Sequence, residues 1–198
     1  SKLRRYDGIS WSVVPGVSGN RLAASAPDDV WLASSGSTTA SHWDGKAWSD
    51  VVLPANPDVI WATSKTHAWM AGFSASSPKH WRWDGSSWTS MPVPTPAGNA
   101  RVFGGTGPND VFMIDSVFGR VYRLSGEKFL LGTSMEGNDA RALWSRSPTE
   151  TFAVGTNGRI ARWDGSAWES LETPARLELL AVGGAAPNAL WAVGQHGA

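Results

Sequence analysis

Basic side chains recur at one fixed position along this chain, two residues before a short turn sequence. They form a column of five: Arg5, His42, Arg82, Arg123 and Arg162. A guanidinium can donate hydrogen bonds to a carboxylate or lie over an aromatic ring. Such a column is typical of a repeated ligand pocket, with arginine as donor and an aromatic ring as stacking face. Structural contacts with neighbouring tryptophans and turn carboxylates are the favoured interpretation, and the ligand pocket stays open as the alternative.

The basic column belongs to a repeat whose clearest copy reads Arg162-Trp163-Asp164-Gly165-Ser166-Ala167-Trp168. At the aspartate position the other copies carry Asp7, Asp44, Asp84 and, in a divergent copy, Ser125. Successive markers are separated by 37, 40, 41 and 39 residues. A period of this size indicates a solenoid or a propeller. Counting from Asp164 through the C-terminus to Asp7 gives a further step of 41, which predicts a ring that closes on itself.

Each period contains four short apolar or alternating segments separated by turn residues, which predicts an all-β chain. In the fourth period these segments are 142–144, 151–155, 159–163 and 168–171. The Asn-Gly and Asp-Gly pairs between them favour tight hairpin turns, because these residues tolerate positive φ. The marker aspartate therefore has a structural reason to be present, and each period is expected to form one four-stranded antiparallel blade.

The two ends of the chain each supply half of a blade. Segments 179–183 and 190–194 correspond to the first two strands of a repeat, and segments 2–6 and 10–13 correspond to the last two. We therefore predict that residues 1–198 form a single domain, a five-bladed β-propeller whose ring is closed by N- and C-terminal strands sharing one blade. Such pairing leaves no open sheet edge at the seam.

Two segments carry a resemblance to a known repeat, namely Thr151-Phe152-Ala153-Val154-Gly155 and Trp163 to Trp168. Together they resemble the tryptophan-rich bacterial β-propeller repeat, with Asp-Val-Trp-Ala-Val-Gly followed by Trp-Asp-Gly-x-x-Trp, which is similar in style to Kelch and Asp-box repeats. The resemblance extends over all five periods and implies the propeller fold. It implies no particular activity, because propellers carry unrelated functions.

Composition argues against several classes of partner. Lys and Arg together number 17, as do Asp and Glu, so the formal charge is zero and binding to nucleic acid is not expected. No apolar run approaches the roughly 20 residues of a membrane helix. The chain has no cysteine, and its histidines (His42, His67, His80 and His196) lack metal-ligand spacing. We expect a monomer without metal, cofactor or membrane insertion, located outside the cell or in the periplasm if an export signal has been removed.

The leading functional hypothesis is a non-catalytic binding module, either lectin-like with a carbohydrate ligand or a platform for protein interactions. The alternative is a carbohydrate-active enzyme, a glycoside hydrolase or a sialidase-like protein, with carboxylates on rim loops. Acids outside the turn positions are Asp115, Glu127, Glu136, Asp139 and Glu178. Because they share no register, the paired carboxylates that glycoside hydrolysis needs are not evident, and an enzyme is the less favoured interpretation.

Departures from the repeat suggest where a ligand could bind. Most of the 13 tryptophans follow the period and are expected to pack between blades, but Trp81 does not. It lies two residues before Trp83, hence on the same face of one strand. We predict that Trp81, with His80 and Arg82, lines the most ligand-competent surface. Further candidates are Tyr122 as a second wall and the basic residues Arg123, Arg162, Arg5 and His42.

Overall fold

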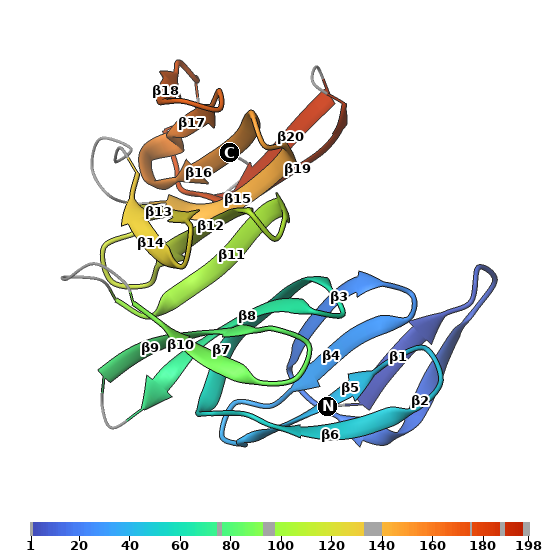
Figure 1. Cartoon of the computed structure of the whole chain (residues 1–198). Helices are drawn as coiled ribbons and strands as arrows, with labels where there is room; N and C mark the ends of the chain where they lie inside the picture. Colours follow the sequence, from blue (N-terminus) through green and yellow to red (C-terminus); the bar gives the residue numbers. More distant parts are fainter. Residues whose placement is uncertain are drawn as a thin grey trace. The chain divides into compact units, whose positions relative to one another are not determined.

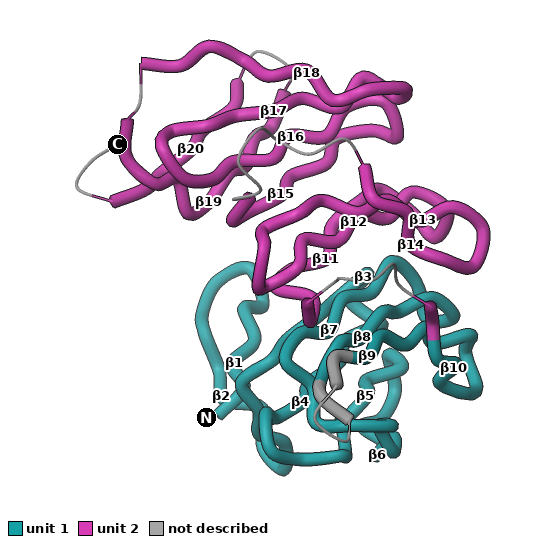
Figure 2. Tube along the Cα trace, turned by 90° about the vertical axis from the view of Figure 1, so that its left-hand side faces the viewer, with its two compact units in different colours: residues 1–90 teal, residues 91–198 magenta. Residues whose placement is uncertain are grey.

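The computed structural model describes residues 2–74, 77–92, 98–132, 140–174, 176–186 and 189–195. Its regular elements are antiparallel strands and one short 3₁₀ segment (Figure 1). The chain divides into two compact units, residues 1–90 and 91–198 (Figure 2). Each unit is built from the same kind of sheet.

The first unit contains one two-stranded and two four-stranded sheets. The two-stranded sheet pairs β1 (Lys2–Tyr6) with β2 (Trp11–Ser18). The next sheet consists of β3 (Arg21–Ala26), β4 (Asp29–Ala33), β5 (Thr39–Trp43) and β6 (Trp48–Val52). The third consists of β7 (Asn56–Ser64), β8 (His67–Ser74), β9 (Ser77–Trp83) and β10 (Trp88–Met91). In both larger sheets, neighbours in sequence are neighbours in space.

The second unit repeats this plan in the opposite order. Its first sheet consists of β11 (Ala100–Gly107), β12 (Asp110–Asp115), β13 (Val121–Ser125) and β14 (Lys128–Leu131). Its second consists of β15 (Ala140–Ser147), β16 (Glu150–Gly155), β17 (Ile160–Trp163) and β18 (Trp168–Leu171), with η1 (Thr156–Gly158) between β16 and β17. A two-stranded sheet follows, made of β19 (Leu179–Ala186) and β20 (Ala189–Gly194).

The predicted all-β class and the four-stranded antiparallel repeat are confirmed by these sheets. The two terminal pairs, β1–β2 and β19–β20, form separate two-stranded sheets. The fifth blade and the closed ring therefore stay predictions. Three residues named in the sequence analysis lie outside the described residues, namely Glu136, Asp139 and His196.

The marker turn has the structural role expected of it. In the clearest copy, Oδ1 of Asp164 accepts hydrogen bonds from the backbone N–H groups of Ser166 at 2.7 Å and Ala167 at 2.8 Å. These bonds lower the pKa of the Asp164 carboxyl to about 2. Gly165 follows with φ of +104°, a conformation that favours glycine. The aspartates at positions 7, 44 and 84 accept the same pair of backbone bonds.

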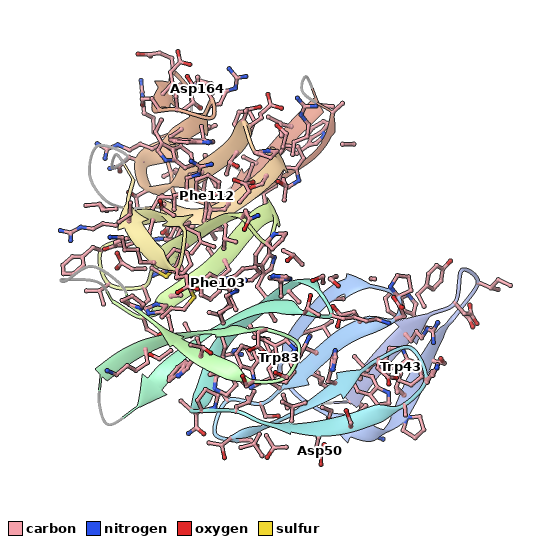
Figure 3. All side chains as sticks on the ribbon, in the orientation of Figure 1. Trp43, Asp50, Trp83, Phe103, Phe112 and Asp164 are labelled. Atoms are coloured by element: carbon pink, nitrogen blue, oxygen red, sulfur yellow. The ribbon has the colours of Figure 1, made fainter. Side chains whose placement is uncertain are left out.

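Aromatic side chains that follow the period hold successive sheets together within each unit. In the first unit, Trp31 of β4 is fully buried and meets Trp83 and Trp88 edge-on, with ring centroids 5.3 and 5.6 Å away. In the second unit, Phe112 of β12 meets Trp163 and Trp168 in the same way, at 5.9 and 5.6 Å. Figure 3 labels Trp83 and Phe112 in these clusters. The aromatic residue of a second strand thus packs against the tryptophan pair of the next repeat.

Candidate ligand site

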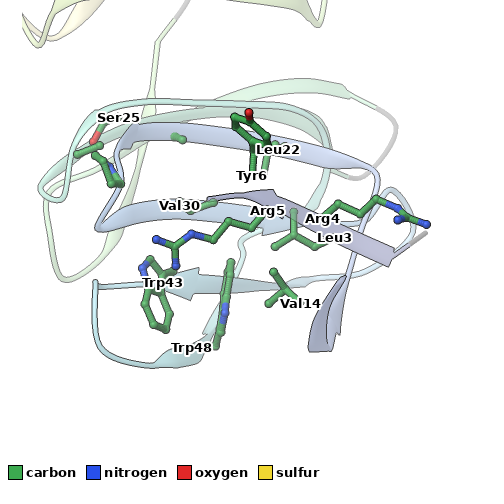
Figure 4. Close-up of a pocket in the computed structure, with 13 residues that line it drawn as sticks. Leu3, Arg4, Arg5, Tyr6, Val14, Leu22, Ser25, Val30, Trp43 and Trp48 are labelled. Carbon is green, nitrogen blue, oxygen red and sulfur yellow. The ribbon is translucent and has the colours of Figure 1, made fainter. Parts of the chain in front are cut away.

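A cavity of about 670 Å³ in the first unit has one aromatic wall and one basic edge. The wall is made by the half-buried indoles of Trp43 and Trp48, whose centroids lie 5.7 Å apart. Arg5, on β1, extends toward Trp43, whereas the neighbouring Arg4 points away from it (Figure 4). This difference follows from the strand, since successive side chains of β1 face opposite sides.

The rest of the cavity lining is almost entirely apolar. Its members come from β1 to β4 and the loop after β3: Leu3, Tyr6, Val14, Leu22, Ala24, Ser25, Ala26, Pro27 and Val30. The two arginines are its only charged residues, so no carboxylate lines it. An apolar, concave wall with a few polar groups at the edge is typical of ligand sites. Here the edge carries positive charge.

Related clefts border the tryptophan pair in two other repeats. In the second unit, Trp163 and Trp168 border a cavity of about 490 Å³ together with Arg123. In the first unit, Trp83 and Trp88 border a cavity of about 540 Å³ lined on its other side by 50–54. The cleft therefore recurs in these three repeats, but the charge of its lining differs. The cleft beside Trp83 and Trp88 is lined by the Asp50 carboxylate and by no cation.

Most of the basic column is paired with buried acids. His42 Nε2 lies 2.7 Å from Oδ1 of the fully buried Asp29, which also accepts the hydroxyl of Ser25. Nη2 of Arg123 lies 3.8 Å from Oδ1 of Asp110, and its Cζ lies 4.9 Å from the centroid of the Trp163 ring. The structural interpretation therefore holds for these two repeats.

The fourth repeat shows the same pairing. Arg162 Nη2 lies 3.3 Å from Oε1 of Glu150, a buried carboxylate that Arg146 also contacts. The acid stands two residues before the second-strand aromatic each time, as in Asp29-Val30-Trp31, Asp110-Val111-Phe112 and Glu150-Thr151-Phe152. Sequence reasoning missed these acids. The signal was their constant offset from the aromatic column.

Two arginines of the column have no such acid. In the repeat of Arg82 the acid position, two residues before Trp69, is held by His67. Burial together with the Arg82 charge lowers the pKa of the His67 imidazole. Arg5 is exposed, and its guanidinium forms no ion pair with any acid in the described part of the chain. In the repeat order, the acid position that belongs to Arg5 is Ala189.

The structure corrects the predicted role of Trp81, His80 and Tyr122 as ligand-facing residues. Trp81 is 7% exposed and belongs to the core cluster of the first unit, on the same strand face as Trp83. It pairs with Met70 across β8 and β9, and both side chains are covered. His80 and Tyr122 are each 1% exposed. Because their faces are taken up by packing, they offer no stacking surface. The larger side chain at position 81 fills core space instead.

Two of the acids named for the enzymatic alternative, Asp115 and Glu178, have structural partners. Asp115 is buried and accepts backbone N–H bonds from Val117, Phe118 and Arg120. Glu178 pairs with Arg141. Glu127 is exposed.

Metal-binding clusters and membrane-spanning helices are both absent from the described residues. There, no group of three or more histidine, aspartate or glutamate side chains is arranged to hold a metal ion. In the same part of the chain, no helix has the length and apolar character needed to cross a membrane.

Comparison with known proteins shows the fold. No protein-family model matches the chain, and no curated protein matches its sequence. Among solved structures, "YCF48 bound to D1 peptide" is similar with a TM-score of 0.67 and 18% identity over 94% of this chain. Virginiamycin B lyase from Staphylococcus aureus is similar with a TM-score of 0.69 and 15% identity over 88% of this chain. A streptogramin B lyase is similar with a TM-score of 0.63 and 16% identity over 87% of this chain. This chain covers 66%, 62% and 61% of their respective lengths. These likenesses show a β-propeller-like repeat architecture.

Proposed function

We propose that this chain is a non-catalytic binding module for a protein partner, built on a ring of five four-stranded blades. One observation carries the proposal: the apolar cavity of about 670 Å³ with the Trp43 and Trp48 indoles on its wall and Arg5 at its edge. Indole rings supply apolar contact area, and an arginine at the edge fixes the orientation of a polar group. The proposal includes the basic column that borders or supports such clefts, namely Arg5, His42, Arg123 and Arg162.

The strand register supports the closed ring. Across the second and third strands, Trp31 lies opposite His42, Phe112 opposite Arg123 and Phe152 opposite Arg162. If the fifth repeat kept this register, Trp191 of β20 would lie opposite Arg5 of β1. Trp191 is 77% exposed, whereas Trp31 and Phe112 are fully buried. Closure would bury it as its counterparts are buried, and the burial of an aromatic side chain is a strong driving force.

The choice of a protein partner rests on the cavity and on one structural neighbour. YCF48 was solved bound to a peptide, so a fold of this kind can hold a polypeptide segment. The two lyases are enzymes by name, which keeps the catalytic alternative testable. Against it, the clefts at the tryptophan pairs contain at most one carboxylate each in the described residues, Asp50. Acid–base hydrolysis of a glycoside requires two.

A parallel screen tests the proposal. The protein is applied to a peptide array and a glycan array and incubated with chromogenic glycosides. We expect saturable peptide binding that Trp48→Ala weakens by at least about fivefold, a typical effect of losing one aromatic contact. Trp168→Ala, in the equivalent cleft of the second unit, is the matched control and should leave peptide binding unchanged. Binding confined to glycans, or turnover of a glycoside, would overturn the proposal.

A further inference from the structure

We propose that the Trp43–Trp48 cavity selects a partner segment in which a carboxylate neighbours an aromatic or aliphatic side chain, with Arg5 as the carboxylate receptor. The inference deepens the proposed function and rests on it, because it names the chemistry that the cavity recognises. It depends on the charge of the basic column and on the apolar character of the cavity wall.

The first step is the charge of Arg5. In three of the five repeats the basic side chain is matched by a buried acid two residues before the second-strand aromatic: Asp29, Asp110 or Glu150. In the repeat of Arg5, the position two residues before the second-strand aromatic is Ala189, so pairing of the terminal strands would bring no acid to Arg5. The charge therefore stays available for a ligand. A guanidinium presents a planar fork of donors that fits both oxygens of a carboxylate.

The second step is the position of that charge. Arg5 extends toward Trp43, over the wall that also carries Trp48 (Figure 4). A ligand that places its carboxylate at Arg5 would bring its adjoining side chain against the indoles and against Val14. Apolar contact and charge pairing would then act on neighbouring groups of one segment. A neutral apolar segment would leave the guanidinium unused, and an acidic segment without an apolar neighbour would leave the wall unused.

The third step compares equivalent clefts. Beside Trp163 and Trp168 the arginine, Arg123, is already paired with Asp110, and beside Trp83 and Trp88 the charged residue is Asp50. Among these three described clefts, the one at Arg5 combines a tryptophan pair with an uncompensated cation. If the ring closes, Trp191 would lie against the Trp43 and Trp48 indoles as Phe112 lies against Trp163 and Trp168. The cleft at Arg123 is about 490 Å³ with Phe112 in place, so closure would leave a smaller cleft between Arg5 and the two indoles.

Two matched peptides test the inference on the full chain. One is acetyl-Gly-Glu-Phe-Gly amide, and the other has glutamine in place of glutamate. Binding is followed by NMR shifts of the indole N–H signals, assigned with Trp43→Phe and Trp48→Phe. We expect the glutamate peptide to bind about tenfold more tightly, as suits one charge-assisted pair. Arg5→Gln should abolish this preference, whereas Arg5→Lys should keep part of it. Lys46→Gln removes the same charge from the exposed turn between Trp43 and Trp48, and this variant should keep the whole preference for the glutamate peptide.

Each other outcome contradicts a separate part of the inference. Equal affinity for both peptides, or a preference that survives Arg5→Gln, shows that Arg5 is not the receptor. A preference lost equally in Lys46→Gln shows a general charge effect. Tighter binding of free 3-phenylpropionate than of the glutamate peptide shows a small-molecule acid site. The proposed function fails on a different result, namely the absence of any peptide binding. If a neutral apolar peptide bound the wall, the proposed function would stand although the inference about Arg5 failed.

Discussion

Trp191→Ala is the sharpest test of the proposed ring. The side chain is 77% exposed, and if it stayed so, its truncation would change the free energy of unfolding by no more than about 0.5 kcal/mol. Closure gives it the place that Trp31 and Phe112 have in their repeats, where each is fully buried against two indoles. Truncation of a buried aromatic to alanine costs about 3–5 kcal/mol. We therefore expect Trp191→Ala to destabilise the protein by about that amount.

Urea unfolding followed by circular dichroism measures this cost. Phe112→Ala serves as the internal standard for a buried position. Val52→Ala, at a residue that is 78% exposed, serves as the standard for an exposed one. A Trp191→Ala cost equal to that of Val52→Ala refutes closure. A cost that appears only at high protein concentration also refutes it, since the indole would then be buried by a second copy.

Three further predictions concern the repeat itself. Asp29→Ala should lower the free energy of unfolding by about 1–3 kcal/mol in thermal or urea melts, because the His42 imidazole, whose side chain is 12% exposed, loses its acceptor. An unchanged midpoint contradicts the structural role of the pair. Gly165→Ala should cost about 1–3 kcal/mol, because φ is +104° and a Cβ there would lie 2.7 Å from a neighbouring side-chain carbon; Gly107→Ala, with open space, is the control and should cost less. The Asp164 carboxyl has a folded pKa of about 2 against a usual 3.8, so its contribution to stability is present above pH 4 and is lost as the pH falls toward 2. Stability measured over that range should fall less steeply in Asp164→Asn, and identical slopes contradict the assignment.

The repeat period, the strand count per repeat and the turn chemistry could be predicted from the sequence. These properties are local. Asp164 and Gly165 determine their turn through bonds to residues two and three positions away, so neighbouring residues contain the whole signal. The packing role of in-register aromatics such as Trp163 could also be predicted, because a constant spacing places them on the same face of every blade.

The candidate site depended on contacts between distant residues. Trp81 breaks the period, yet whether that exposes it or buries it was decided by Met70 and the core around it. The pairing of Arg123 with Asp110 joins two strands, and only their register brings the charges together. The sequence by itself determined the repeat, since periodic spacing encodes which way each side chain faces. The tertiary structure decided which side chains remain free to meet a ligand, because exposure depends on what packs across from them.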